Sequence, residues 1–274
     1  MINFDQMRNE CLELRNTIVD MIHNAGSGHS GGSLSAVEIV WTLYSQVMNA
    51  SADKKDDPDR DRFILSKGHA APALYAVLAR LGYFPESELD NLRKTGSMLQ
   101  GHPDMKKTPG VEMSTGSLGM GTSVGLGMAL SGRLDKKDYK VYVLVGDGEL
   151  QEGQNWEAFM AANKFKASNL IVIIDENGVQ LDGTTEEIMP MLDISEKIRS
   201  FGFDIKKCDG HDCEDVYNAL VWAKEGGDNP DAPKAVVAQT VKGKGVSFME
   251  GKNTWHGAKI TDELYDVAKK DLAS

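Results

Sequence analysis

Apolar residues recur at helical spacing over several stretches of the chain. This pattern predicts amphipathic helices over residues 5–24 and 33–48, and two further helices near 70–82 and 149–166. Glycine and serine dominate residues 24–33, and they are expected to break the chain between the first two helices. The N-terminal part of the chain is therefore expected to be mainly helical.

Two later stretches, 139–146 and 169–175, are almost continuously apolar, which is typical of strands covered on both faces in a parallel sheet. Shorter strands are predicted near 203–208 and 234–241, and a short strand or turn at 63–69. Because strands and helices alternate, we predict an α/β fold with a doubly wound, mainly parallel sheet. The sequence contains neither an internal repeat nor a long Pro/Ser linker, so residues 1–274 are expected to form a single domain.

Composition excludes several classes of protein. A formal charge of -11 argues against DNA or RNA as the main partner, because a basic surface is the usual footprint of such binding. The sequence has no apolar run long enough to span a bilayer and no evident signal peptide. Three cysteines do not make a disulfide framework, and a reducing cytoplasm fits them.

Two of those cysteines, Cys208 and Cys213, lie close to His211 in the stretch CDGHDC. These residues suggest a metal site, but this interpretation is disfavoured because a second pair of ligands at zinc-like spacing is not evident elsewhere.

Polar residues follow both long apolar strands. The first strand runs into Gly146-Asp147-Gly148, and the second is followed by Asn177. A parallel crossover brings the carboxyl ends of both strands to one edge of the sheet, so Asp147 and Asn177 are expected to be neighbours. Carboxylate and amide oxygens suit Mg²⁺ or Ca²⁺, and the glycines let the backbone approach a bulky anion. We therefore expect a divalent cation that holds a diphosphate. For Gly-Asp-Gly alone a turn with a helix cap is the favoured interpretation, and the matching Asn177 after the next strand reverses this in favour of the cation.

This pair of loops resembles the thiamine diphosphate motif, and the wider chain is similar to the transketolase family. The blocks that carry the resemblance run in order from residue 27 to 258: SGHSGG, SKGHA, GHPD, STGSLGMG, GDGELQEG, DENGVQLDG and WHGA. Any one block is weak, whereas seven in the same order are very specific. The resemblance implies the thiamine diphosphate-binding fold of that family, specifically the domain that holds the diphosphate and the metal.

The resemblance also implies roles for individual residues. It makes Asp147, Asn177 and the backbone carbonyl of Val179 ligands of Mg²⁺, or of Ca²⁺ or Mn²⁺ in its place. It implies that thiamine diphosphate is contacted by Gly116, Leu118, Gly148, Glu152, Asp147, Asn177, His69 and His256. Family members more often have Ile at position 179, a departure of little weight because the backbone binds the metal. Glu152 matches a glutamate of a carboxylate network between subunits.

Four of the six histidines, His29, His69, His102 and His256, match active-site positions of the family, and each lies beside glycine in a loop-like stretch. Imidazole can donate to a developing alkoxide and exchange protons near neutral pH, as ketol transfer requires. His23 and His211 have no match and are assigned no role. Ser30 stands where the family usually has proline, and in this respect the chain looks closer to the short, split transketolases.

The resemblance implies that a second domain is needed. In the family, a glutamate from a pyrimidine-binding domain activates the cofactor, and residues after 258 are too few to supply that domain. The chain is therefore expected to be the N-terminal subunit of a split transketolase, forming an α₂β₂ assembly with a C-terminal subunit. It is expected to move a two-carbon ketol unit from a ketose phosphate to an aldose phosphate.

Other functions remain open from the sequence. Among thiamine enzymes the alternatives are a 1-deoxyxylulose-5-phosphate synthase-like half, a subunit of a 2-oxo acid dehydrogenase or decarboxylase, and a transketolase for a branched or sulfonated sugar. The stretch GSLGMG (116–121) loosely resembles a nucleotide-binding fingerprint, but it lacks a clear preceding strand. A non-catalytic subunit that kept the fold is disfavoured by the retained Asp147, Asn177 and histidines.

Overall fold

The computed structural model describes residues 2–273, and within them five strands form one parallel sheet in the order β1-β2-β3-β5-β4. The strands are β1 (Arg62–Leu65), β2 (Val141–Gly146), β3 (Leu170–Glu176), β4 (Asp204–Asp209) and β5 (Lys234–Gln239). The predicted doubly wound α/β fold is confirmed. The strands predicted at 139–146 and 169–175 begin and end within two residues of the observed strands β2 and β3.

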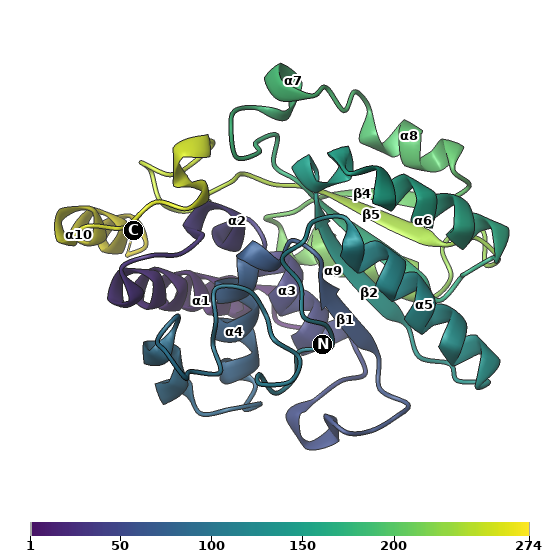
Figure 1. The fold of residues 1–274 in the computed structure, drawn as a ribbon, viewed down its shortest axis with the longest axis horizontal. Helices are drawn as coiled ribbons and strands as arrows, with labels where there is room; N and C mark the ends of the chain where they lie inside the picture. The colour runs from purple at the N-terminus through teal and green to yellow at the C-terminus, as the bar shows by residue number, and fades with distance from the viewer. Residues whose placement is uncertain (1, 274) are drawn as a thin grey trace.

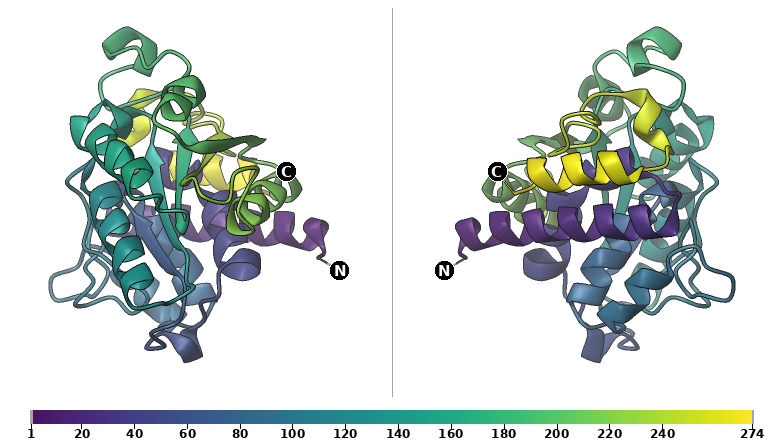
Figure 2. Two further views of the ribbon diagram at one scale, coloured as in Figure 1. Left: turned by 90° about the vertical axis from the view of Figure 1, so that its right-hand side faces the viewer. Right: turned by 90° about the vertical axis from the view of Figure 1, so that its left-hand side faces the viewer.

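The helices cover both faces of this sheet (Figure 1). They are α1 (Phe4–Ala25), α2 (Ser30–Leu34), α3 (Val37–Thr42), α4 (Ala71–Arg80), α5 (Met120–Leu134), α6 (Gly153–Lys164), α7 (Thr185–Ile188), α8 (Ile194–Ser200), α9 (Cys213–Lys224) and α10 (Asp262–Asp271). Helices α5 and α6 lie on one face, and α1, α3, α4 and α9 lie on the other. The C-terminal helix α10 runs beside α1 (Figure 2).

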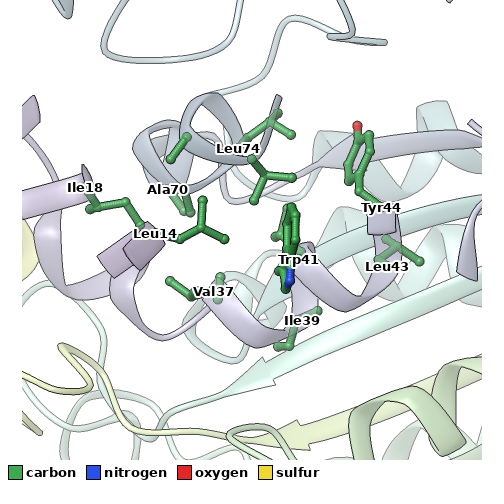
Figure 3. Packing of buried hydrophobic residues seen from close by; sticks show 14 of the residues in the cluster. Leu14, Ile18, Val37, Ile39, Trp41, Leu43, Tyr44, Ala70 and Leu74 are labelled. Carbon is green, nitrogen blue, oxygen red and sulfur yellow. The ribbon is translucent and has the colours of Figure 1, made fainter. Parts of the chain in front are cut away.

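Alternate residues of the central strands enter two separate cores. Tyr142 and Leu144 of β2 pack with the helices on the α1 side, whereas Val141, Val143 and Val145 pack with those on the α5 side. This alternation explains the continuous apolar run in the sequence, because both faces of the strand are buried. On the α1 side the core is filled by large side chains from α1, α3 and α4, among them Leu14, Ile18, Val37, Trp41 and Leu74 (Figure 3).

Three local predictions need correction. The stretch 24–33 was expected to be non-helical throughout. The non-helical part ends at His29, since helix α2 already begins at Ser30. The helix expected over 33–48 is divided at Ala36, and its last turn, Leu43–Val47, is a π-helix. The short strand or turn expected over 63–69 is divided into a strand that ends at Leu65 and a 3₁₀ turn at Gly68–Ala70. In the first two cases tertiary packing overrides local sequence signals, because these residues are buried against α1 and α4.

Candidate active site

The carboxyl ends of three strands meet at one edge of the sheet. Gly146 at the end of β2 pairs with Asp175 of β3, and Glu176 at the end of β3 pairs with Gln239 of β5. Because the strands end level, the loops that follow them surround one pocket. Its lining includes Asp147, Gly148, Asn177, Val179, Gln180, Lys242, Leu118, Glu152, His69 and His256. The predicted convergence of Asp147 and Asn177 is therefore present.

Asp147 joins the two loops directly. Its carboxylate accepts hydrogen bonds from the backbone N–H of Gly148 (2.8 Å) and, across the pocket, from the backbone N–H of Gly178 (2.6 Å). Burial raises the pKa of Asp147 to about 6, with the charge of Asp175 adding to the effect and the two N–H donors opposing it. A buried carboxylate of this kind is stabilised by a nearby cation, which would reverse the direction of the pKa shift.

The oxygen atoms around Asp147 fit a hard divalent cation. The Asn177 side-chain oxygen accepts from the backbone N–H of Val179 (3.2 Å), and the Val179 carbonyl lies at the same pocket. Within residues 2–273 there is no cluster of three or more His, Cys, Asp or Glu side chains that could hold a metal. A cation here would therefore rest on one carboxylate and two neutral oxygens, and would need phosphate or water oxygens to complete its shell.

Lys242 is a pocket residue that was not predicted from the sequence. Its buried ammonium group lies 3.2 Å from the Val179 carbonyl oxygen, 3.4 Å from the Gln180 carbonyl oxygen and 3.1 Å from His256 Nδ1. Burial, followed by the charge of Lys67, lowers the pKa of Lys242 to about 8, while Asp147 and Asp175 oppose the shift. Lys242 therefore remains a cation at neutral pH. The sequence did contain a feature that could have indicated this role, because Lys242 follows the predicted strand 234–241 and so lies at the same sheet edge as Asp147.

A buried ion pair lies next to the pocket, at the ends of strands β1 and β3. Lys67, which follows β1, binds Asp175 near the end of β3, and both side chains are almost completely buried. Asp175 also accepts from the Ser35 hydroxyl (2.6 Å) and from the Thr240 hydroxyl. Although burial acts to raise the pKa of Asp175, the charge of Lys67 and these hydrogen bonds hold it below its usual value. The pair fixes three strand ends relative to one another.

The four predicted histidines form one cluster beside the pocket. The ring centroid of His29 lies 5.5 Å from that of His69, 5.8 Å from that of His102 and 5.4 Å from that of His256. Burial is the first cause that lowers the pKa of each ring, and neighbouring positive charges add to it; the pKa is about 4 for His29 and for His256. The rings are therefore neutral at pH 7. A neutral imidazole can donate one hydrogen bond and accept another.

The other predicted residues are placed as follows. Leu118, Gly148 and Glu152 line the pocket. Gly116 has a φ of 141°, and a Cβ atom there would lie 2.9 Å from Cδ2 of His102. Glycine is thus required at 116 both by its backbone conformation and by the close approach of the histidine ring.

The two remaining histidines lie away from the pocket. His23 contacts Asp262 on the surface (2.9 Å), and His211 Nδ1 contacts Glu38 (3.1 Å). The CDGHDC stretch does not gather a metal cluster within the described residues. Instead, Cys213 Sγ lies 3.9 Å from Cys11 Sγ, and His211 Nε2 accepts from the backbone N–H of Val241 (2.8 Å).

Comparison with known proteins gives the family. Residues 7–273 match the family described as transketolase, thiamine diphosphate binding domain. The chain is 42% identical over 259 residues to the 6-deoxy-6-sulfo-D-fructose transketolase subunit SqwG of Clostridium sp. (strain MSTE9), covering 94% of this chain and 93% of that protein. It is 40% identical over 275 residues to an apulose-4-phosphate transketolase subunit of Phocaeicola vulgatus, covering 97% of this chain and 95% of that protein.

Solved structures agree. The transketolase of Campylobacter jejuni superimposes with a TM-score of 0.92 at 30% identity, covering 99% of this chain and 43% of that one. The chain thus spans about two fifths of a full-length transketolase, but nearly all of the two relatives named as transketolase subunits. With the pocket, the sheet and the sequence match in agreement, this chain belongs to the transketolase family and comprises its thiamine diphosphate-binding domain.

Proposed function

We propose that the pocket at the sheet edge holds the diphosphate of thiamine diphosphate through Mg²⁺, or through Ca²⁺ or Mn²⁺. Asp147, Asn177 and the Val179 carbonyl would hold the cation, and Gly148 and Lys242 would face the diphosphate. The observation that carries the proposal is the 2.6 Å hydrogen bond from Gly178 to Asp147, which brings two loops 31 residues apart to one pocket. When bound, thiamine diphosphate supplies a nucleophilic carbon and an electron sink.

The reaction we propose is transfer of a two-carbon ketol unit from a ketose phosphate to an aldose phosphate. The residues of this chain would orient the sugar and stabilise charge on its oxygens. Neutral histidine rings suit this task, because each can donate a hydrogen bond to an oxygen that becomes an alkoxide. We assign this task to His29, His69, His102 and His256, and the support is that their rings contact one another beside the pocket.

Two observations support a partner subunit. The chain covers about two fifths of full-length transketolases, and its relatives named as subunits have nearly the same length. We therefore propose that a C-terminal subunit supplies the pyrimidine-binding half, in an α₂β₂ assembly. Glu152, which is exposed at the pocket rim, is the residue we assign to the contact. Three free cysteines fit a cytoplasmic location, and within residues 2–273 no helix is long and apolar enough to cross a membrane.

The names of the relatives favour a second candidate for the sugar. One relative is named for a sulfonated fructose and two for apulose 4-phosphate. A transketolase that acts on a sulfonated or branched sugar is therefore a specific alternative to one that acts on ordinary pentose phosphates. Parallel assays of the assembled enzyme with xylulose 5-phosphate, apulose 4-phosphate and 6-deoxy-6-sulfofructose distinguish these donors, and pyruvate tests the other thiamine enzymes.

We expect the chain alone to show no ketol transfer and to gain it on mixing with its partner. The physical reason is that residues 7–273 match the domain that holds the diphosphate, and the rest of the cofactor would be contacted by the proposed partner subunit. The measurement is the transfer activity of the separate subunits and of the mixture, with thiamine diphosphate and Mg²⁺ present. Calorimetry of the same samples reports cofactor binding independently of turnover. Full activity of the purified chain without a partner would refute the split arrangement.

Lys242→Met should weaken thiamine diphosphate binding by about 10- to 100-fold, because a hydrogen bond to a charged group contributes about 1.5–3 kcal/mol. The chain should still fold, with a modest loss of stability, since methionine fills most of the same space while the Val179 and Gln180 carbonyls and His256 Nδ1 lose a donor. Calorimetry and thermal unfolding measure the two effects. Lys252→Met, at an exposed position ten residues away, is the matched control. An unchanged dissociation constant would remove Lys242 from the diphosphate site.

A further inference from the structure

Arg93 has a backbone conformation that is uncommon for its residue type. Its φ is 62°, in the left-handed region where residues other than glycine are rare, and its N–H donates to the Leu99 carbonyl at 2.7 Å. Such a conformation costs free energy and persists where the surroundings hold it in place, often at functional sites. The side chain of Arg93 was assigned no role from the sequence.

The guanidinium group of Arg93 lies against His29. Its Nη2 is 3.3 Å from His29 Nδ1, and its Nη1 donates to the Ser27 hydroxyl at 3.4 Å. Gly101 makes room for it, because a Cβ atom at that position would lie 2.8 Å from Nη2 and 3.0 Å from Cζ. The guanidinium thus lies between residues 27–29 and Gly101, beside one nitrogen of one ring.

This contact determines where the proton of His29 resides. A guanidinium group has five N–H donors and no acceptor, so the nitrogen it faces must accept. Nδ1 of His29 is therefore unprotonated, and the proton of the neutral ring lies on Nε2. The Nε2 edge faces Gly257, where a Cβ atom would lie 3.7 Å from Nε2, and the ring adjoins those of His69 and His256.

The charges around His29 also favour the neutral ring. The titratable or charged groups around His29 are Arg93, His69, His102, His256 and Lys242. Burial, followed by the charges of Arg93, His102 and Lys242, lowers the pKa of His29 to about 4. A ring with this pKa gains no second proton at neutral pH.

We propose that Arg93 is a positioning residue that keeps His29 as a neutral ring with its proton on Nε2, so that His29 acts as a fixed hydrogen-bond donor to a sugar oxygen. The part that concerns the sugar rests on the proposed function. The part that concerns the ring does not, because it follows from the contacts within this chain. His29 in this role does not shuttle protons, in contrast to the proton exchange expected from the sequence.

The test is ¹⁵N NMR of the imidazole nitrogens in the isolated chain between pH 5 and pH 8, with His29→Gln to assign the signals. The wild type should show Nδ1 as an acceptor and Nε2 as protonated, unchanged across this range. In Arg93→Met the two tautomers should mix, and the midpoint of the His29 titration should rise by up to about one pH unit toward its ordinary value, because burial still acts on the ring. The substitution keeps the same left-handed backbone requirement, so the strain is matched.

Two further variants separate the contact from the charge. Gly101→Ala should push the guanidinium away from His29 while keeping its charge, and should mix the tautomers with a smaller rise in the titration midpoint. Arg80→Met removes a positive charge at an exposed position that contacts Glu13, and should leave the His29 signals unchanged. Thermal unfolding of each variant confirms that it is folded.

A single Nε2-protonated tautomer with an unchanged titration in both Arg93→Met and Gly101→Ala would overturn the proposal. These spectra need neither cofactor nor partner. Failure of the proposed function would instead appear as absent thiamine diphosphate binding in calorimetry. The two failures are therefore distinguishable.

Discussion

Asp147→Ala should weaken Mg²⁺-dependent binding of thiamine diphosphate by at least about 100-fold, and should abolish ketol transfer by the assembled enzyme. Removing a residue that only hydrogen-bonds to a metal ligand lowers the affinity for the metal by about 10- to 100-fold. Removing the one carboxylate among the proposed ligands should therefore cost at least the upper value. The carboxylate is also the group through which the Gly178 loop is held, at 2.6 Å. Calorimetry with the cofactor, with and without Mg²⁺, measures the change.

Asp147→Asn separates the charge from the shape. It preserves the volume and an oxygen acceptor for Gly178, so the loops should stay together while the affinity for the cation falls. Asp59→Asn, which removes an exposed carboxylate paired with Lys137, is the control and should bind normally. If Asp147→Asn bound Mg²⁺ and cofactor like the wild type, the carboxylate would not be a metal ligand.

Arg15→Met should lower the free energy of unfolding by about 3–5 kcal/mol at neutral pH, because it leaves the buried carboxylate of Glu38 without its main partner. Arg15 Nη1 and Nη2 bind the two Glu38 oxygens at 2.6 and 2.7 Å, and the two residues are only 6% and 5% exposed. Arg15 Nε also donates to the Lys244 carbonyl at 3.2 Å, in the loop that carries Lys242. Urea unfolding measures the loss.

The pH dependence of this loss has a definite sign. Burial acts to raise the pKa of Glu38, but Arg15 and His211 outweigh it and hold the folded-state pKa below the ordinary 4.5. The pair therefore contributes stability above pH 4.5, and this contribution is lost as the pH falls through the folded-state pKa. Without Arg15, burial should raise the pKa of Glu38 in the variant, so the difference in unfolding free energy between wild type and Arg15→Met should narrow as the pH falls, beginning above pH 4.5 and continuing below it. Arg15→Met/Glu38→Gln, which removes the buried charge as well, should recover part of the loss, and equal stability of both variants would contradict the argument.

The sheet and the meeting of its loops could be predicted from the sequence for a physical reason. Strands β2 and β3 are buried on both faces, so their apolar runs are unbroken, and parallel strands place Asp147 and Asn177 at one edge. The histidines were found through motif blocks rather than through periodicity. Their gathering into one cluster depends on contacts between four distant segments.

Other parts of the site could not be predicted from local patterns. Arg93 and Lys242 are charged residues in polar stretches, and an exposed surface position is the ordinary interpretation of such residues. Their roles depend on where their side chains end, which is fixed by a positive φ at Arg93 and by burial at Lys242. Helix α9 was not predicted either, although Asp212 caps it by accepting from the N–H groups of Glu214 and Asp215. Its signal is a cap followed by the buried residues Val216 and Leu220.

The most direct test of the proposed cofactor site is a crystal structure of the assembled enzyme with thiamine diphosphate and Ca²⁺, with the ion located by its anomalous scattering. We predict one Ca²⁺ at about 2.3–2.6 Å from an Asp147 carboxylate oxygen, the Asn177 side-chain oxygen and the Val179 carbonyl oxygen, with diphosphate oxygens in the same shell. An ion or a diphosphate bound away from these three oxygens would contradict it.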